Sequence, residues 1–261
     1  MIITISENQY HVDIHGEGEP VVLLHGFTGS TNTWLKTTNQ LKDHYQCIVI
    51  DLPGHGQTRA KVTSMEQACE DIAEVLTELK VETFHLLGYS MGGRTALVFT
   101  SMFQDRVEKL ILESASPGLE GKARVDRQEQ DNRLANFIET KGIEEFVDYW
   151  ETIPLFKSQE KLAEAEQASI RKERLSQNPS GLTMSLRTMG TGMQPNMWPK
   201  LNDIQVPTLL ITGELDEKFF DINQKVVKAL PDAIHEVIPD VGHAPHLENS
   251  SFFGKIVLNY L

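Results

Sequence analysis

One serine lies between glycines where an apolar run passes directly into a helical pattern. The apolar residues Phe84–Leu87 lead into Gly88-Tyr-Ser-Met-Gly-Gly93, and helical spacing follows. A strand that turns so sharply into a helix brings backbone segments together, so Gly88 and Gly92 must lack side chains. Ser90 is then expected at the head of a helix, where the dipole and free N–H groups favour developing negative charge. The segment predicts a strand–turn–helix unit that carries a candidate nucleophile.

Further short apolar runs, bounded by turn residues, fit strands that are buried on both faces of a parallel sheet. They are Pro20–Leu24, Cys47–Ile50, Val107–Leu112, Val206–Ile211 and His235–Ile238. Helical patterns cover Trp34–Leu41, Ser64–Leu79, Met91–Met102, Asp221–Leu230 and Phe252–Leu261. Met1–Ile5 and Tyr10–His15 predict an antiparallel hairpin at a sheet edge. The alternation of strands and helices predicts an α/β fold with a mostly parallel, doubly wound sheet.

The composition changes in the middle of the chain. Between Glu120 and Arg174, 23 of 55 residues are charged, against 23% in the whole chain, and the apolar periodicity is helical. Charged amphipathic helices need only one apolar face, and here that face would cover a site at the end of the sheet. We therefore expect residues 118–200 to be an inserted helical cap, or lid. Residues 1–117 and 201–261 would form one core.

A serine hydroxyl needs a base, and the base needs a group that orients it. Where a serine stands in a turn of this kind, the chain order is serine, acid, histidine. Asp216 and His243 each follow a late apolar run, so they fall at the carboxyl ends of strands, where open α/β sheets bind ligands. We expect them to complete a triad with Ser90. Asp221 and Asp240 remain alternatives for the acid, and His246 remains an alternative for the base.

The segment His25-Gly-Phe27 directly follows the first central apolar run. In sites of this kind that loop supplies one backbone N–H to an oxyanion hole, and the residue after the nucleophile supplies the second. We assign the hole to the backbones of Phe27 and Met91. His25 is expected to stabilise the turn rather than to carry a proton.

Composition excludes several classes of protein. The chain has 24 Lys+Arg against 37 Asp+Glu, a net charge of −13, which argues against a nucleic-acid or anionic-membrane surface. Cys47 and Cys69 are too few for a disulfide framework, and no metal-ligand spacing occurs. The start of the chain lacks a basic region before its short apolar stretch, and no apolar run reaches 18 residues. We expect a cytoplasmic protein with no metal, no cofactor and no membrane span; the oligomeric state stays open.

These residues resemble the α/β-hydrolase superfamily across essentially the whole chain. Within it, the chain resembles the 2-succinyl-6-hydroxy-2,4-cyclohexadiene-1-carboxylate synthase family of menaquinone biosynthesis. The motifs that carry this narrower resemblance are Glu113-Ser-Ala-Ser-Pro-Gly-Leu119, Trp150-Glu-Thr-Ile-Pro-Leu-Phe156, Arg174–Gly181, Ser185–Trp198 and Gly213-Glu-Leu-Asp-Glu-Lys-Phe219. Most of them lie in the expected cap or at its borders.

The resemblance implies a carbon–oxygen lyase rather than a hydrolase. The family removes pyruvate from 2-succinyl-5-enolpyruvyl-6-hydroxy-3-cyclohexene-1-carboxylate. Ser90 would then act as a base, activated by His243 and Asp216, and take a proton from a ring carbon. The developing charge moves toward the succinyl carbonyl, whose oxygen the oxyanion hole holds. No acyl-enzyme is needed.

This substrate carries three carboxylates, for which bidentate arginine is a suitable partner in a shielded site. Arg94 lies one helical turn beyond Ser90 and would face the same opening. From the cap, the resemblance points to Arg124 and Arg174, with Arg127 and Arg187 as rivals. The remaining matches to family pocket positions are Tyr89, Trp150 and Lys218.

Two other functions remain open. A carboxylesterase or a C–C bond hydrolase would use the same triad with Ser90 as a true nucleophile, but a small apolar ester needs no arginine cluster. A ligand-binding module without catalysis would be expected to lose Ser90, Asp216 or His243, and none is missing.

Overall fold

The computed structural model describes residues 1–261 and is built on one eight-stranded sheet. The strands are β1 (Ile2–Ile5), β2 (Asn8–His15), β3 (Glu19–Leu24), β4 (Tyr45–Ile50), β5 (Phe84–Tyr89), β6 (Val107–Glu113), β7 (Thr208–Gly213) and β8 (Ala233–Ile238). Their order is β1-β2-β4-β3-β5-β6-β7-β8. The strands from β4 to β8 in this order are parallel, and the antiparallel β1–β2 hairpin is confirmed at one edge.

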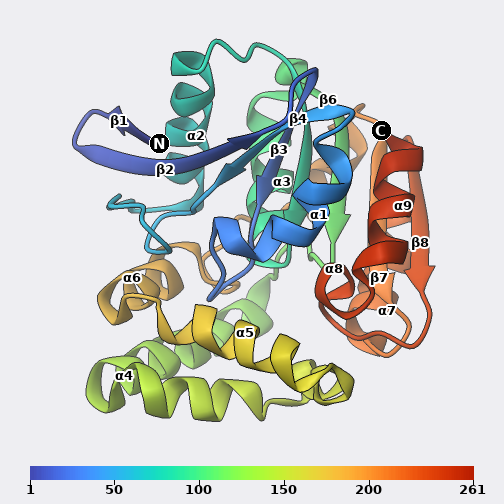
Figure 1. The fold of residues 1–261 in the computed structure, drawn as a ribbon. Helices are drawn as coiled ribbons and strands as arrows, with labels where there is room; N and C mark the ends of the chain where they lie inside the picture. The colour runs from blue at the N-terminus through green and yellow to red at the C-terminus, as the bar shows by residue number, and fades with distance from the viewer.

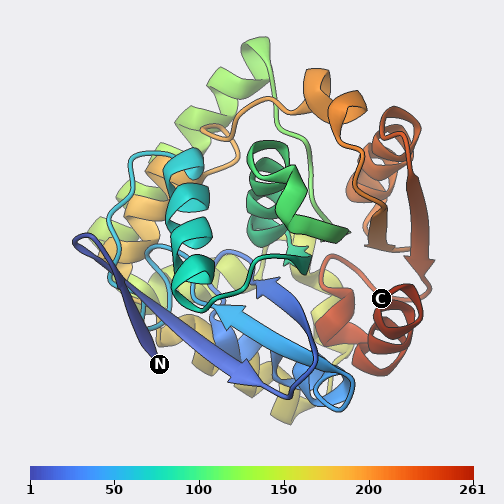
Figure 2. The same ribbon diagram turned by 90° about the horizontal axis from the view of Figure 1, so that it is seen from above.

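Helices cover both faces of this sheet, as Figure 2 shows from above. One face carries α2 (Met65–Glu78), α3 (Met91–Met102) and α7 (Glu217–Ala229), and the other carries α1 (Leu35–Leu41) and α9 (Ser250–Tyr260). Short helical turns complete the core at η1 (Thr31–Trp34), η2 (Gln104–Arg106), η4 (Trp198–Asp203) and α8 (Pro245–Glu248). The predicted mostly parallel, doubly wound α/β sheet is confirmed.

The continuous apolar runs follow from burial on both faces. In β3, Val22 and Leu24 join the cluster beneath α2 and α3, whereas Val21 and Leu23 join the cluster beneath α1 and α9. Successive strand side chains point to opposite faces, so a strand covered on both sides must be apolar at every position.

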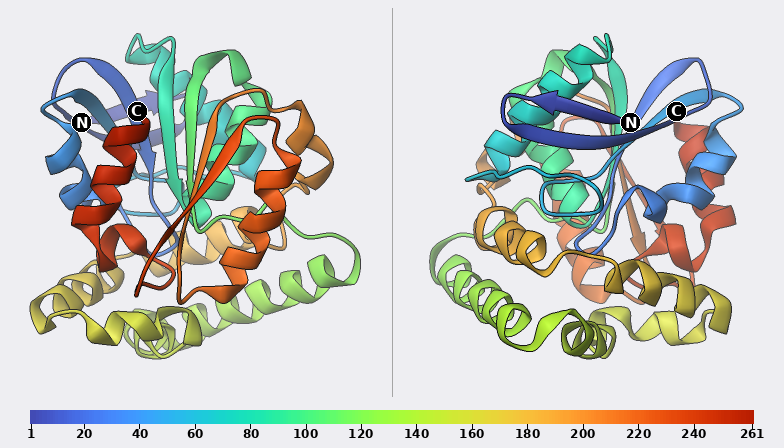
Figure 3. Two further views of the ribbon diagram at one scale, coloured as in Figure 1. Left: turned by 90° about the vertical axis from the view of Figure 1, so that its right-hand side faces the viewer. Right: turned by 60° about the vertical axis from the view of Figure 1, so that its left-hand side comes forward.

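A separate layer of helices lies across one end of the sheet (Figures 1 and 3). It contains α4 (Gly121–Glu151), η3 (Pro154–Lys161), α5 (Glu164–Leu175) and α6 (Pro179–Met189). Helix α4 bends at Gly142, whose φ of 82° and ψ of −179° are not helical. A small apolar cluster of its own joins α4 to α6. We propose that residues 118–200 form the inserted cap that the sequence predicts.

The structure contains neither a membrane-spanning helix nor a cluster of potential metal ligands. No helix has the length and apolar character needed to cross a membrane. No group of three or more His, Cys, Asp or Glu side chains is placed to hold a metal ion.

Candidate active site

The serine turn between β5 and α3 is made possible by two glycines. A Cβ on Gly88 would overlap the Gly92 carbonyl oxygen, and a Cβ on Gly92 would overlap the Leu24 carbonyl oxygen of β3. Ser90 itself has a φ of 49° and a ψ of −104°, a strained conformation for a residue with a side chain. The turn therefore presents the Ser90 side chain beyond the end of the sheet.

The structure brings the three expected triad residues together. His243 Nε2 lies 3.1 Å from Ser90 Oγ, and His243 Nδ1 lies 2.6 Å from Asp216 Oδ2. His243 is 1% exposed and Asp216 is buried beside it. When Nδ1–H donates to Asp216, Nε2 is free to accept the serine proton. This geometry allows Ser90 to be deprotonated.

The alternatives for acid and base have other surroundings. Asp221 and Asp240 are exposed and pair with neither histidine. His246 pairs with the buried carboxylate of Glu113 instead of with Ser90. Asp216 also caps α7, since its Oδ1 accepts the Phe219 N–H at 3.3 Å.

Two backbone donors near the serine have no acceptor in the protein. Phe27 and Met91 both line the cavity at Ser90, and neither N–H donates to a protein acceptor. They can therefore receive a developing oxyanion. Beside them, His25 Nδ1–H donates to the Gly26 carbonyl at 2.7 Å, and His25 Nε2 accepts the Leu52 N–H at 2.9 Å. Burial lowers the pKa of His25 to about 4, so it is a neutral support for the turn.

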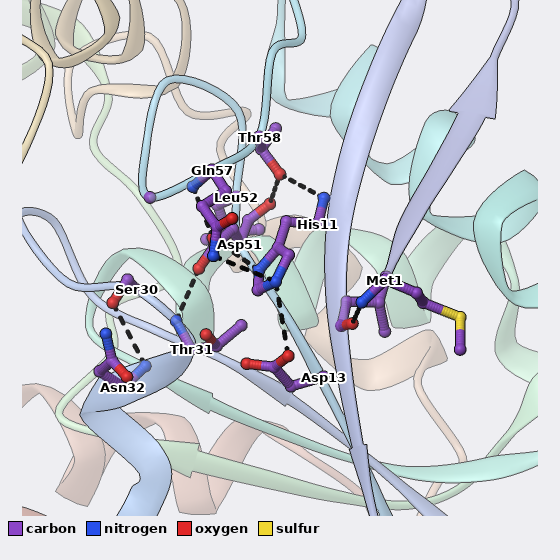
Figure 4. A network of polar contacts seen from close by, with 12 residues as sticks. Met1, His11, Asp13, Ser30, Thr31, Asn32, Asp51, Leu52, Gln57 and Thr58 are labelled. Atoms are coloured by element: carbon purple, nitrogen blue, oxygen red, sulfur yellow. Dashed lines mark hydrogen bonds and ion pairs between the residues drawn. The ribbon is translucent and has the colours of Figure 1, made fainter.

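A buried carboxylate fixes the loop behind this oxyanion site (Figure 4). Asp51, at the end of β4, accepts the Thr31 N–H at 2.6 Å and the Gln57 N–H at 2.8 Å, and His11 Nδ1 lies 3.0 Å away. Burial raises the pKa of Asp51, while these donors oppose the rise. The loop from β3 to η1 is thereby tied to the loop after β4.

The cavity at Ser90 has a volume of about 230 Å³ and an uneven charge distribution. Three of its lining residues, Arg94, Arg127 and Lys218, are basic, and no Asp or Glu lines it. Burial, together with the nearby Arg127, lowers the pKa of Arg94 to about 10, so Arg94 stays charged at neutral pH. Burial likewise lowers the pKa of Lys218. A chain of net charge −13 thus has a cationic cavity, which suits an anionic substrate.

Arg124 does not line the cavity at Ser90, whereas its rival Arg127 does. Arg124 Nε donates to the Gly192 carbonyl at 3.1 Å, and its Nη2 donates to the Met193 carbonyl at 3.3 Å, outside the cavity. Arg127 lines the cavity and is held by Asp131 at 2.7 Å.

The other cap arginines lie outside the cavity lining. Arg187 pairs with Glu139 and Asn136 on the cap surface. Arg174 is 6% exposed, and its guanidinium lies 4.8 Å from the ring centroid of Phe156, which does line the cavity. Arg174 Nη2 also donates to Gln159 Oε1 at 3.0 Å. It therefore stands directly behind the cavity wall.

The remaining expected pocket residues, Tyr89 and Trp150, line the cavity with Ser90 and His243. Burial raises the pKa of Tyr89, which keeps its phenol neutral. Trp150 Nε1 is buried and has no hydrogen-bond partner. Leu134, Phe156 and Phe219 supply apolar cavity wall. Phe156 and Phe219 end two of the family motifs, but nothing in the sequence assigns them a role in the pocket, and Leu134 has only ordinary helical spacing.

Fold and site together define a protein of the α/β hydrolase fold, and the model of that family matches residues 19–250. A putative 2-succinyl-6-hydroxy-2,4-cyclohexadiene-1-carboxylate synthase from Bacillus subtilis is 46% identical over 268 residues, which cover 99% of this chain and 97% of that protein. The chain belongs to this synthase family.

Two solved structures are similar to the chain at different levels of sequence identity. The structure of MenH from S. aureus has a TM-score of 0.93 and 37% identity, and the match covers 96% of this chain and 97% of that one. A thermophilic esterase from Thermogutta terrifontis has a TM-score of 0.88 and 25% identity, with 100% and 97% covered. The resemblance stated from the motifs is confirmed.

Proposed function

We propose that the chain is a lyase that eliminates pyruvate from 2-succinyl-5-enolpyruvyl-6-hydroxy-3-cyclohexene-1-carboxylate. The product would be 2-succinyl-6-hydroxy-2,4-cyclohexadiene-1-carboxylate. The observation that carries the proposal is the serine–histidine–aspartate arrangement beside a cavity with three basic residues and no carboxylate. Membership of the synthase family supports it.

In the proposed reaction, Ser90 transfers its proton to His243 and removes a proton from the ring carbon next to the succinyl carbonyl. The electron pair shifts toward that carbonyl oxygen, which the Phe27 and Met91 N–H groups stabilise. The pair then returns to the ring, the ring double bond shifts by one position, and the carbon–oxygen bond to the enolpyruvyl group breaks. The proton that His243 received goes to the departing group, which leaves as pyruvate, and no covalent enzyme intermediate forms.

For substrate binding, we propose that Arg94, Arg127 and Lys218 meet the carboxylates. Arg174 would act from behind Phe156, which it stacks against. Tyr89 and Trp150 would complete the wall around the ring, with Trp150 Nε1 free to donate. We also propose a cytoplasmic location, since Cys47 and Cys69 are both free buried thiols.

The proposal is tested by mixing purified protein with the enolpyruvyl substrate and measuring pyruvate. We expect release of one pyruvate per substrate. A carboxylesterase would instead turn over p-nitrophenyl esters and release none. Rapid ester turnover without pyruvate release would replace the lyase by this second function, which the likeness to the Thermogutta esterase keeps open.

The base role of Ser90 makes a separate prediction. Ser90→Ala removes the only hydroxyl within reach of His243 Nε2 and should lower kcat for elimination by at least about a thousandfold, as loss of a triad member does. Pyruvate release under saturating substrate measures the effect. Residual turnover near the wild-type rate would mean that another group removes the proton.

A further inference from the structure

A second buried acid–histidine pair lies beside the triad. Glu113, at the end of β6, and His246, in α8, are each buried to 1% exposure or less. Glu113 Oε1 accepts both the His246 backbone N–H at 2.9 Å and its ring Nδ1–H at 2.8 Å. The two residues are separated by 133 positions in the chain, so this contact joins distant segments.

Glu113 also contacts the nucleophile from its backbone. The Ser90 N–H donates to the Glu113 carbonyl at 2.8 Å, across the β5–β6 pairing. One residue thus holds Ser90 through its main chain and the segment of His243 through its side chain. Because His246 is only three residues beyond His243, movement of one must shift the other.

The same loop is also tied to the segment after β7, because the Leu215 N–H donates to the Val241 carbonyl at 2.9 Å and His243 pairs with Asp216. Glu248, a residue of the same loop, adds two further bonds. Glu248 accepts the Gly242 N–H at 2.7 Å and the Ala244 N–H at 3.2 Å, on either side of His243. These bonds shape the loop but do not attach it to the sheet. The His246 ring is wedged between Tyr89 and Trp34, with centroids 4.6 and 4.7 Å away.

We propose that Glu113 and His246 are positioning residues that set the distance between Ser90 and His243. Ser90 is held by the sheet, and the Glu113–His246 pair connects the same part of the sheet to the loop of His243. Neither residue lines the cavity, so neither touches the substrate. The proposal rests on the proposed use of Ser90 and His243 and is independent of which anion the cavity binds.

The test compares Glu113→Gln with Glu113→Met. Glutamine keeps an oxygen acceptor for both His246 donors, whereas methionine has a similar length and no strong acceptor. A misplacement of about 1 Å can cost on the order of a hundredfold in rate. We expect Glu113→Met to lower kcat for pyruvate release by at least about tenfold with KM within about twofold, and Glu113→Gln to retain most of the rate.

A second pair of variants guards against a failure to fold. In His246→Asn the side-chain amide takes the place of Nδ1–H, and in His246→Leu no donor remains. Phosphonylation of Ser90 by a fluorophosphonate should slow in His246→Leu and recover in His246→Asn. The matched control is Tyr10→Phe, which removes a different buried hydrogen bond, that to Asp71, far from the triad.

One readout needs no turnover at all. The His243 Nδ1–H bonded to Asp216 should give a far-downfield proton resonance, which should shift in Glu113→Met and not in Glu113→Gln or Tyr10→Phe. Folded Glu113→Met and His246→Leu proteins with wild-type kcat, labelling and resonance would overturn the proposal, as would equal losses in Tyr10→Phe. A wild type that shows this resonance but releases no pyruvate would contradict the proposed function alone.

Discussion

Arg124 and Arg127 are three positions apart on α4, and their guanidinium groups have different partners. Arg124 donates to two carbonyls of the 192–193 segment, whereas Arg127 is oriented by Asp131 and lines the cavity. Residues three apart lie on neighbouring parts of a helix surface. Arg124 has a structural role and Arg127 lines the cavity because segment 192–193 crosses the helix at Arg124. The spacing of the two residues along the helix does not reveal this crossing.

A matched pair of substitutions tests this difference. Arg127→Met should lower kcat/KM for pyruvate release by about tenfold to a hundredfold, because a charge-assisted hydrogen bond contributes about 1.5–3 kcal/mol. Arg124→Met should leave kcat/KM within about threefold and affect mainly thermal stability. The two constants are measured under identical salt. A larger loss in Arg124→Met would favour Arg124 over Arg127 as the arginine that binds the substrate.

The triad residues could be located from the sequence because chain order and strand ends fix them. Ser90, Asp216 and His243 each follow an apolar run, and parallel strands bring these ends together. Glu113 was visible only as part of a motif. Its partner His246 looked like a rival base, since sequence does not show which of two nearby histidines turns toward the serine.

At the scale of elements, the nucleophile turn depends on contact between β3, β5 and α3. The Gly92 Cα lies against the Leu24 carbonyl, and Gly88 lies against the Gly92 carbonyl. The glycines that the sequence required for a sharp turn are therefore also needed where neighbouring elements meet. This close approach lets α3 begin immediately after Ser90.

Gly92→Ala should disturb that contact severely. Its methyl group would overlap main-chain atoms of β3, so we expect loss of several kcal/mol of unfolding free energy and of most activity. Urea unfolding measures the loss. Gly121→Ala is the control: nothing lies within 4 Å of its Cβ, and only its positive φ of 54° costs about 1 kcal/mol. Equal effects at both positions would contradict the steric explanation.

Element boundaries were less accurate than element types. The helix expected over Asp221–Leu230 begins at Glu217, because Asp216 caps it while also orienting His243. The spacing of apolar residues does not show that Asp216 both caps the helix and orients His243. In α4, Gly142 interrupts a helical pattern with a conformation that only glycine adopts easily, so the bend was not foreseen.

For the whole molecule, the charge distribution matters more than the total. The net charge of −13 is carried by carboxylates elsewhere, and none lines the cavity at Ser90. The composition therefore indicated a surface unsuited to polyanions, and it could not indicate a local cationic site. Only folding, which brings α3, α4 and the start of α7 together, places Arg94, Arg127 and Lys218 around one cavity.

Global stability should fall in mild acid through two buried histidines. Burial lowers the pKa of His25 to about 4 and that of His55 to about 3, against about 6.5 in the unfolded chain. Unfolded protein therefore binds these protons first, and their contribution to stability is full above pH 6.5 and is lost as the pH falls toward 4. Each costs on the order of 1 kcal/mol per pH unit in this window.

His55→Phe tests this dependence and keeps an aromatic ring against Phe27. Unfolding free energies from urea titrations at pH 7, 6 and 5 should decline less steeply in the variant than in the wild type. The variant also loses the bond from His55 to the Pro53 carbonyl, which lowers the unfolding free energy at every pH. The test therefore compares the slopes of unfolding free energy against pH. Parallel slopes would show that His55 takes no part.

The contact of Gly92 with Leu24 limits how such a site can diversify. Mutations that move the serine must also move the central strand beside it, and they therefore destabilise the fold. Selection for folding removes such mutations, so a new activity does not arise through them. Of the cavity-lining residues between 118 and 200, only Gly118 and Gly190 lie so close to main-chain atoms that a Cβ would overlap them. New specificities, whether evolved or engineered, should therefore accumulate in the helices above the serine while the turn beneath them stays unchanged.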